Sequence, residues 1–384
     1  MRSLVSRPYR GGQKMSTHDL YALPAELSAW EVPMSGNARL NWEYGEPRGQ
    51  LLTLYQKGKD KQWDGATRID WDLDVDPENP LSVAREIMPL YGSSVYAKLD
   101  DAGIAELLRH QVAWQFSNFL HGEQAAMICS ARIVESVPDI DAKFYAATQT
   151  MDEARHAEIY ARFLQEKLEL YYPINQCLKS LLDDVLSDSR WDIPYLGMQV
   201  LIEGLALAAF GLLRDLTGAA LPKQILTYVM QDEARHVAFG RIALRDYYKQ
   251  ISDRERTERE EFVLEGCRLL KGRFIGEEVW GTLGFDVDAC REHVNNSENL
   301  RYFNGLLFAR VVPCIRDIGL WSPRVRDGLT QLGVINMADS DLVALMRQDE
   351  DLAERLDAER FAAQESQRRA EVASVIDDAV DGQP

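Results

Sequence analysis

The stretch MDEARH at residues 151–156 recurs as QDEARH at residues 231–236. A repeat of this kind inside one chain calls for a structural explanation. In an α-helix, residues three positions apart lie on one face, so each copy presents a glutamate and a histidine in the same direction. We therefore expect two helices that each offer one carboxylate and one imidazole to a common site. The alternative is that both copies are exposed helix segments with ordinary charge patterning.

Two further glutamates stand at matching positions ahead of the repeats. Glu123 precedes Glu153 by 30 residues, and Glu203 precedes Glu233 by the same 30 residues. Both lie among apolar neighbours, in FSNFLHGEQAAMICSA and QVLIEGLALAAFG. A carboxylate in such surroundings is costly to bury unless it is paired or bound to a metal. The pattern is that of ferritin-like bundles, in which two helices give a glutamate and two give Glu-x-x-His to a pair of metal ions.

The order Glu, ExxH, Glu, ExxH, over about residues 100–250, resembles the non-haem di-iron carboxylate superfamily. Its members include bacterial multicomponent monooxygenases, ribonucleotide reductase small subunits, acyl-carrier-protein desaturases and arylamine N-oxygenases. The segments GEQAAMICSA, TMDEARHAE and MQDEARHVAFG are most similar to the hydroxylase large subunits of the monooxygenases. The resemblance implies that two iron ions, or manganese with iron, are bound by Glu123, Glu153, His156, Glu203, Glu233 and His236.

The same resemblance implies roles for the residues beside the ligands. Asp152 and Asp232 are expected to hydrogen-bond to the opposing histidine, which fixes the orientation of each imidazole. Arg155 and Arg235 are expected to pair with those aspartates. For the two arginines, an ion pair that only stabilises the bundle is an equal alternative.

The types of ligand indicate the metals and the chemistry. Carboxylates and imidazoles are hard and borderline donors, which suit iron or manganese better than copper or a structural zinc. Two divalent ions carry +4 against the −4 of four glutamates, so the reduced site is neutral and can be buried. Apolar surroundings exclude water from such a site.

Single positions distinguish the branches of the superfamily. The monooxygenases carry a threonine one turn after the third glutamate, where this chain has Leu207. Tyr160 stands one turn after the first motif histidine, the position of the radical tyrosine in the reductase subunit, although a core aromatic is the simpler interpretation. Val229 stands where the arylamine N-oxygenases have a seventh, histidine ligand. The separation of 80 residues between the two repeats is more similar to the desaturases.

Helix faces around the ligands supply candidate residues for a substrate pocket. For most of them ordinary core packing is the alternative. The candidates, with Tyr160 as a redox or pocket residue, are Met127, Gln149, Gln199, Leu207 and Phe210.

The chain divides into three parts by pattern. We predict an irregular N-terminal arm over residues 1–98, an all-α ferritin-like four-helix bundle with flanking helices over 99–335, and an acidic, partly disordered segment over 336–384. Prolines stand at the borders of the long apolar segments, where they start or stop helices. The expected helices are 101–135, 139–172, 193–216, 222–250, 257–276 and 298–319.

The amino-acid composition limits the kinds of partner that the protein can bind. The 384 residues carry 43 basic and 61 acidic side chains, a formal charge of −18. Such acidity counts against nucleic acid or an anionic membrane as a partner. The apolar segment 195–213 contains Glu203, so a central bundle helix is a better interpretation than a membrane span. Five scattered cysteines and the lack of a signal-peptide pattern indicate a reduced, cytoplasmic protein.

These observations predict a di-iron enzyme. We expect it to activate O2 and to hydroxylate or N-oxygenate a small organic substrate. The sequence carries no flavin or nicotinamide fingerprint. Electrons would then come from a separate reductase or ferredoxin, and the protein is expected to be a homodimer. The alternatives are a desaturase-like or radical-generating oxidase and, from another class, an iron-handling protein.

Overall fold

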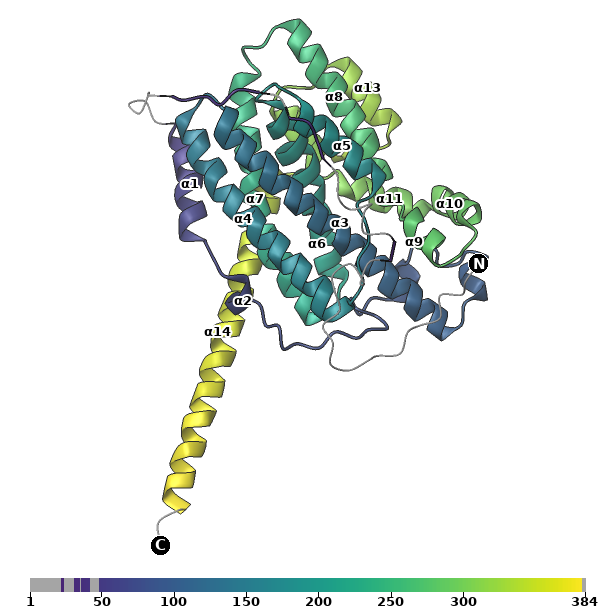
Figure 1. Ribbon diagram of the computed structural model, residues 1–384, viewed down its shortest axis with the longest axis vertical. Coiled ribbons are helices and arrows are strands. Elements are labelled where there is room, and N and C mark those ends of the chain that lie inside the picture. The colour runs from purple at the N-terminus through teal and green to yellow at the C-terminus, as the bar shows by residue number, and fades with distance from the viewer. Residues whose placement is uncertain (1–21, 24–30, 35, 42–47, 382–384) are drawn as a thin grey trace.

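The computed structural model describes residues 22–23, 31–34, 36–41 and 48–381. Within these residues the chain is helical and contains no strand, which confirms the predicted all-α fold class. Long helices form a central bundle, and shorter helices surround it (Figure 1). The other residues of the predicted N-terminal arm, 1–21, 24–30, 35 and 42–47, lie outside the described part of the chain.

Four long helices make up the bundle. They are α3 (Asp101–Ser136), α4 (Ile140–Phe163), α6 (Glu203–Leu216) and α7 (Ala220–Tyr247), with α3 packed along α4 and α6 along α7. The first two begin at aspartate N-caps, since the Asp100 and Asp139 side chains accept hydrogen bonds from free backbone N–H groups of the first turn. Each of the four helices carries part of the repeated pattern, so the fold brings the four segments of that pattern to one centre.

Two π-helical segments, η5 (Leu164–Leu168) and η6 (Tyr195–Ile202), interrupt the regular bundle. The second leads directly into α6, whose first residue is Glu203. Wider π turns shift the positions of the following side chains and occur often at functional sites. Gly240 of α7 allows close packing here, because a Cβ at this position would lie 2.5 Å from the Cβ of Gln199.

The continuous helix Tyr195–Leu216 is long and apolar enough, by length and composition, to cross a membrane. Most of its residues are buried inside the protein. It therefore occupies the position of a central bundle helix, as the sequence predicts.

Flanking helices lie on opposite sides of the bundle (Figure 1). They are α1 (Gly49–Asp60), α2 (Gly65–Arg68), α5 (Gln176–Ser187), α8 (Asp253–Gly272), α9 (Glu277–Thr282), α10 (Val287–Asn296), α11 (Glu298–Leu307), α12 (Val311–Asp317) and α13 (Pro323–Gln331). Of these, α1 lies at one side of the bundle and α9, α10 and α11 lie at the other. The single helix expected over 298–319 is wrong, because the chain forms α11 and α12 with a turn between them. Pro313 explains the break, since its ring cannot follow a preceding helical turn but fits the first turn of a new helix.

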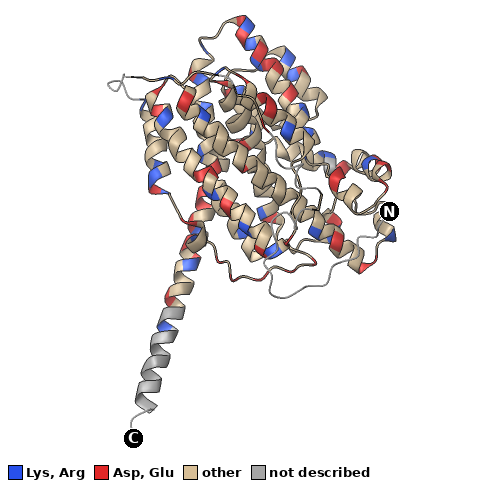
Figure 2. Ribbon diagram, viewed as in Figure 1, with Lys and Arg blue, Asp and Glu red and all other residues tan. Residues whose placement is uncertain are grey.

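The acidic C-terminal segment contacts the body of the protein. It forms one helix, α14 (Leu342–Asp381), whose first half packs against α7 while the rest extends away from the bundle (Figure 1). Its acidic residues meet basic residues of the body: Asp349 is buried against Arg310 (2.6 Å) and Arg214 (3.3 Å), and Asp357 contacts Arg68 (2.6 Å). Part of the segment's negative charge is thus used in docking. Figure 2 shows that both signs of charge are interspersed over the outer helices.

The ion pairs of Asp349 lead to a test of this docking. Asp349→Ala would leave the buried guanidinium of Arg310 without its carboxylate and that of Arg214 with only the exposed Asp215, so we expect the free energy of unfolding to fall by about 3 kcal/mol. Urea denaturation measures the change. Asp351→Ala, on the exposed side of the same helix, should change stability by less than about 0.5 kcal/mol. Equal effects of the two substitutions would show that the buried pairs do not anchor α14.

Candidate metal centre

Six side chains with metal-binding groups meet in the centre of the bundle. Glu123 comes from α3, Glu153 and His156 from α4, Glu203 from α6, and Glu233 and His236 from α7. All six are buried, and the most exposed of them, Glu123, is 5% exposed. The structure therefore brings together all the residues that the sequence motif singles out as ligands.

The six side chains form two groups that share two members. Glu123, Glu153, His156 and Glu233 offer one ligand atom each within 4.8 Å of one another, and so do Glu153, Glu203, Glu233 and His236. Glu153 and Glu233 belong to both groups, whereas each of the other four belongs to one. Two cations placed in these groups would share the carboxylates of the two motif glutamates and would each have one further glutamate and one histidine.

Both histidines turn the same nitrogen toward the glutamates. The Nδ1 atom of His156 lies 3.1 Å from an oxygen of Glu233, and that of His236 lies 3.0 Å from an oxygen of Glu153. On the other side of each ring, Nε2 lies 3.1 Å from Asp232 for His156 and 3.3 Å from Asp152 for His236. Each aspartate thus contacts the histidine of the opposite repeat. The hydrogen bond fixes the ring so that Nδ1 is directed at the metal-binding groups.

The two motif arginines connect the aspartates. Arg155 donates to Asp152 (2.5 Å) and to Asp232 (2.8 Å), and Arg235 pairs with Asp232. The guanidinium groups hold the pKa of the Asp232 carboxyl well below its usual range, even though burial alone would raise it. A charged Asp232 can accept the hydrogen bond from His156. The arginines thereby both stabilise the bundle and keep this aspartate ionised.

The segment after α1 completes this network in a way that the sequence motif did not indicate. Trp63 donates from its indole Nε1 to Asp232 (2.9 Å), and Gln62 donates to Asp152 (2.7 Å). Gln62 also accepts a hydrogen bond from Arg155 (2.8 Å). No local sequence motif indicates these contacts, because the partners lie 90 and 169 positions away along the chain.

Gln149, a predicted pocket residue, lies against the ligands. Its amide nitrogen donates to Glu153 of α4 (3.0 Å) and to Glu203 of α6 (2.9 Å), and so links these two glutamates. Gln199 lies in η6 with its amide nitrogen donating to the carbonyl oxygen of Pro194 (3.0 Å) in the orientation that satisfies both amide atoms. It therefore orders the π-helical segment before Glu203.

The pKa shifts of the buried side chains indicate that positive charge would stabilise the site. Burial, together with the charge of Glu233, raises the pKa of Glu123 well above its usual range, and the same two causes raise the pKa of Glu203. Burial lowers the pKa of His156, but its acidic neighbours outweigh this and raise the pKa above the ordinary value. Without cations, the protein must hold protons to bury these groups together.

Several polar atoms of the centre have no hydrogen-bond partner among the described residues. They are Glu153 Oε2, His156 Nδ1, Glu203 Oε2, both carboxylate oxygens of Glu233, and His236 Nδ1. Buried polar atoms are almost always hydrogen-bonded, so a cluster of such atoms in one place requires an explanation. All of them belong to the two ligand groups. The residues therefore fit two divalent ions, as the carboxylate and imidazole donors suggest.

A small cavity of about 20 Å³ adjoins the centre between α3, η6 and α6. Its lining consists of Phe119, Gly122, Glu123, Ala126, Met198, Ile202, Glu203, Ala206, Phe210, Glu233 and Arg273. Of the predicted pocket residues, Phe210 lines it, while Met127 and Leu207 lie outside its lining. Glu123, Glu203 and Glu233 face this space, so it gives access to both ligand groups.

Tyr160 is fully buried beside the centre. Its ring contacts Phe119 and Phe210, and its hydroxyl has no partner among the described residues. Burial raises the pKa of the Tyr160 hydroxyl well above its usual range, and the charges of Glu123 and Glu233 raise it further. The hydroxyl is therefore protonated at neutral pH.

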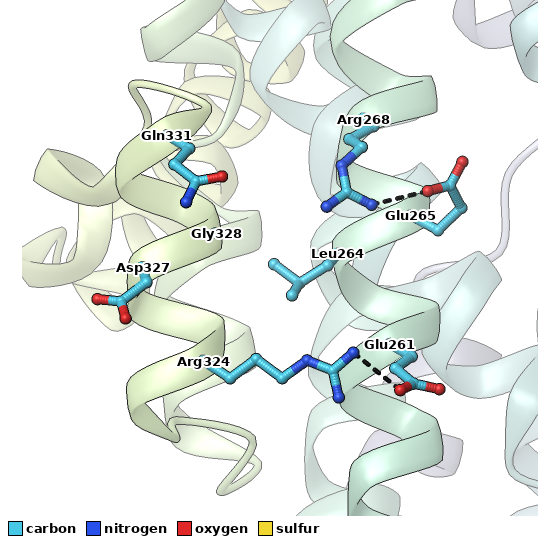
Figure 3. A pocket seen from close by; sticks show the side chains of 8 residues that line it. All are labelled: Glu261, Leu264, Glu265, Arg268, Arg324, Asp327, Gly328 and Gln331. Carbon is cyan, nitrogen blue, oxygen red and sulfur yellow. Dashed lines mark hydrogen bonds and ion pairs between the residues drawn. The ribbon is translucent and has the colours of Figure 1, made fainter.

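A surface groove of the protein is unrelated to the centre. It lies between α8 and α13 (Figure 3), with a volume of about 690 Å³. Four of its charged residues form two ion pairs, Arg324 with Glu261 and Arg268 with Glu265 (both 2.8 Å). It offers no buried ligand groups and does not reach the bundle core.

Residues 48–184 match the model of the family P-aminobenzoate N-oxygenase AurF. The matched range includes Glu123, Glu153 and His156 and ends before Glu203. Among curated protein sequences, none matches this chain.

Solved structures of R2-like ligand-binding oxidases are similar to this chain. A tyrosine-to-phenylalanine mutant with an aerobically reconstituted Mn/Fe cofactor shares 16% identity, with 69% of this chain and 94% of that chain covered and a TM-score of 0.43. A glutamate-to-aspartate mutant, also with an aerobically reconstituted Mn/Fe cofactor, shares 15% identity, with 73% and 96% covered and a TM-score of 0.49.

The helical bundle and the two overlapping ligand groups form a buried site that fits two metal ions, and the family match covers the part of the chain that carries the first Glu-x-x-His repeat.

Replacement of a ligand tests the two-metal arrangement. Glu203→Gln removes a carboxylate from one ligand group only, so we expect bound metal to fall from about two ions to about one ion per chain. Metal content of the reconstituted protein, measured by mass spectrometry, checks this. The metal-free variant should be at least as stable as the metal-free wild type, because one of four crowded carboxylates is gone. Glu265→Gln, exposed on α8, should leave metal content unchanged. Two ions in Glu203→Gln would contradict the assignment.

The aspartate network predicts a smaller effect on metal affinity. Asp232→Asn keeps the shape but weakens the hydrogen bond that orients His156, so metal affinity should fall by about 10- to 100-fold. Competition with a chelator measures this. Trp63→Phe removes only the indole donor to Asp232, so we expect a smaller loss. An unchanged affinity in Asp232→Asn would show that the aspartate does not orient the ligand.

Proposed function

We propose that this protein is an O2-dependent di-metal oxygenase that hydroxylates or N-oxygenates a small organic substrate. The observation that carries the proposal is the pair of overlapping ligand groups beside a cavity lined mainly by apolar side chains. The match to the P-aminobenzoate N-oxygenase family supports N-oxygenation as one form of the reaction. Two irons, or manganese with iron, are the metals that the donor set favours.

The four glutamates would have different roles in such a site. The bound metals would supply the activation of O2. Glu153 and Glu233 would hold both metals, while each of Glu123 and Glu203 would hold one and also face the cavity. Glu123 and Glu203 are therefore the carboxylates that a substrate reaches first.

The surroundings of the cavity protect the site from water. Phe119, Met198 and Phe210 cover the ligands, and the cavity has room for about one water molecule. A substrate can enter only if these side chains move. Such exclusion of water limits side reactions of an oxidising centre.

The partners and surroundings of the enzyme follow from the same arrangement. We propose an external electron donor, a reductase or ferredoxin, because the chain carries no flavin or nicotinamide fingerprint. The five cysteines are free thiols, which supports a cytoplasmic protein. A homodimer, with no nucleic acid or membrane as partner, remains part of the proposal.

Tyr160 favours a second function, that of a radical-generating or desaturase-like oxidase. Its hydroxyl is buried without a partner and lies close enough to Glu123 and Glu233 for their charges to affect its pKa. A tyrosine in this position can donate an electron and a proton to an oxidised centre. The two functions differ in whether the tyrosine or a substrate is oxidised.

One experiment separates these functions. The metal-free protein is loaded anaerobically with ferrous iron, the bound iron is counted, and oxygen is then admitted with and without amines, aromatic compounds and carboxylic acids. An oxygenase should incorporate one atom of labelled O2 into a product. Tyr160→Phe should leave that product yield unchanged.

The outcomes exclude the alternatives in turn. A tyrosyl radical signal that is absent in Tyr160→Phe would favour the radical-generating oxidase. Deposition of ferric mineral without product would favour an iron-handling protein. Fewer than about 1.5 metal ions per chain would contradict the two-metal site itself.

A further inference from the structure

Arg273 is a buried cation beside the metal centre that the proposed function does not use. It follows the last residue of α8 and is 2% exposed. Its side chain lines the same small cavity as Glu123 and Glu203. Gly122 of α3 lies beside it, since a Cβ at that position would be in van der Waals contact with the Nη2 atom of Arg273 at 3.7 Å.

The guanidinium group of Arg273 has almost no polar partner. Its Nε and Nη1 atoms form no hydrogen bond with the described residues, and Nη2 makes only a long contact of 3.4 Å with the carbonyl oxygen of Asn118. Other buried arginines of this protein are paired, as Arg259 is with Asp192 (2.9 Å). Burial lowers the pKa of Arg273 to about 10. A buried, unpaired guanidinium is unfavourable in the free protein and is ready to bind an anion.

A second and larger space lies further along the same helices. It has a volume of about 520 Å³, and Leu108 and Val112 of α3 and Leu213 of α6 contribute to its mainly apolar lining. Phe274, the residue after Arg273, also lines it. We call this space the apolar chamber.

The apolar chamber opens to solvent through exposed apolar residues. Ile87, Tyr91, Leu216 and Tyr302, all of which line it, are 43–70% exposed. Large apolar side chains at this exposure often mark a binding surface. An apolar ligand can therefore enter at this end.

Two aromatic rings separate the apolar chamber from the small cavity. On α3, Phe119 stands one turn after the chamber residue Gln115, and on α6, Phe210 stands one turn before Leu213. The two rings touch, with centroids 4.7 Å apart. Arg273 and Phe274 stand at the same boundary, one lining each space.

We propose that Arg273 binds the carboxylate of an amphipathic monocarboxylic acid whose apolar body lies in the apolar chamber. Arginine forms two parallel hydrogen bonds with a carboxylate through Nη2 and either Nε or Nη1, and the free Nε and Nη1 atoms of Arg273 leave both arrangements available. A singly charged, small head group suits a cavity that also faces three glutamates better than a phosphate does. The inference rests on the proposed function, because the acid would be the substrate class of the oxygenase.

This orientation has a consequence for the site of oxidation. With the carboxylate at Arg273, the carbons next to the carboxyl group lie closer to Glu123 and Glu203 than the far end of the apolar body does. Phe119 and Phe210 must move apart to admit the ligand. We therefore expect oxidation near the carboxyl end of the acid.

Binding measurements test the proposal without turnover. The protein is loaded with Mn²⁺ under anaerobic conditions, and octanoate, octanol and acetate are titrated calorimetrically. Octanoate should bind at least about tenfold more tightly than octanol, because only octanoate pairs with the guanidinium. It should also bind at least about tenfold more tightly than acetate, which leaves the apolar chamber empty.

Variants assign the two parts of the site. Arg273→Gln should reduce the affinity for octanoate to that for octanol, and Arg273→Lys should retain part of the preference. Leu306→Trp, which fills the apolar chamber, should weaken octanoate and octanol alike. Arg268→Gln, at an exposed arginine on the same helix, should bind as the wild type does. The thermal midpoint of Arg273→Gln should equal or exceed that of the wild type, since an unpaired buried charge is removed.

The outcomes separate this inference from the proposed function. Equal binding of octanoate and octanol to the wild type, or unchanged octanoate binding in Arg273→Gln, would overturn the carboxylate site. Equal binding of acetate and octanoate would overturn the role of the apolar chamber. A protein that binds octanoate through Arg273 but does not consume O2 would refute the oxygenase and leave the binding site intact.

Discussion

The structure depends on the burial of four carboxylates and two imidazoles in the centre of an apolar bundle. Such a cluster is unfavourable unless positive charge enters with it, and the unpaired oxygens and nitrogens of these side chains show where that charge belongs. Two divalent cations would balance four glutamates without leaving net charge in the core. The long helices, the π-helical segment before Glu203 and the close packing at Gly240 all position this cluster.

The surroundings of the cluster are organised in two halves with different physical character. On one side, Asp152, Asp232 and the two motif arginines form a charged network that Gln62 and Trp63 close. It orients the histidines and keeps them from turning. On the other side, apolar side chains and the small cavity face the glutamates. The network that orients the histidines and the cavity that admits a substrate thus lie on different sides of the centre. A substrate can therefore approach without disturbing the hydrogen bonds that hold the ligands.

The acidity of the chain has several physical origins. Four of the acidic residues are the buried glutamates, and others lie on α14, where Asp349 and Asp357 pair with arginines of the body. Part of the net charge of −18 therefore comes from buried glutamates, and part comes from aspartates that hold α14 against the body of the protein. The sequence suggests a solvated tail because acidic residues and alanine dominate it. Only the positions of Arg68, Arg214 and Arg310 in space reveal their partners.

The sequence alone determined the helical class and the six candidate ligands, because Glu-x-x-His places both groups on one helix face whatever the tertiary structure is. It could not determine which glutamates face both ligand groups; the packing of four helices assigns that position to Glu153 and Glu233. It also could not find Trp63, Gln62 or Arg273, whose partners are distant in the chain and which carry no local motif. The spacing of apolar residues in the sequence predicts each helix separately. The contacts between helices, and the cavities they enclose, exist only once the chain has folded.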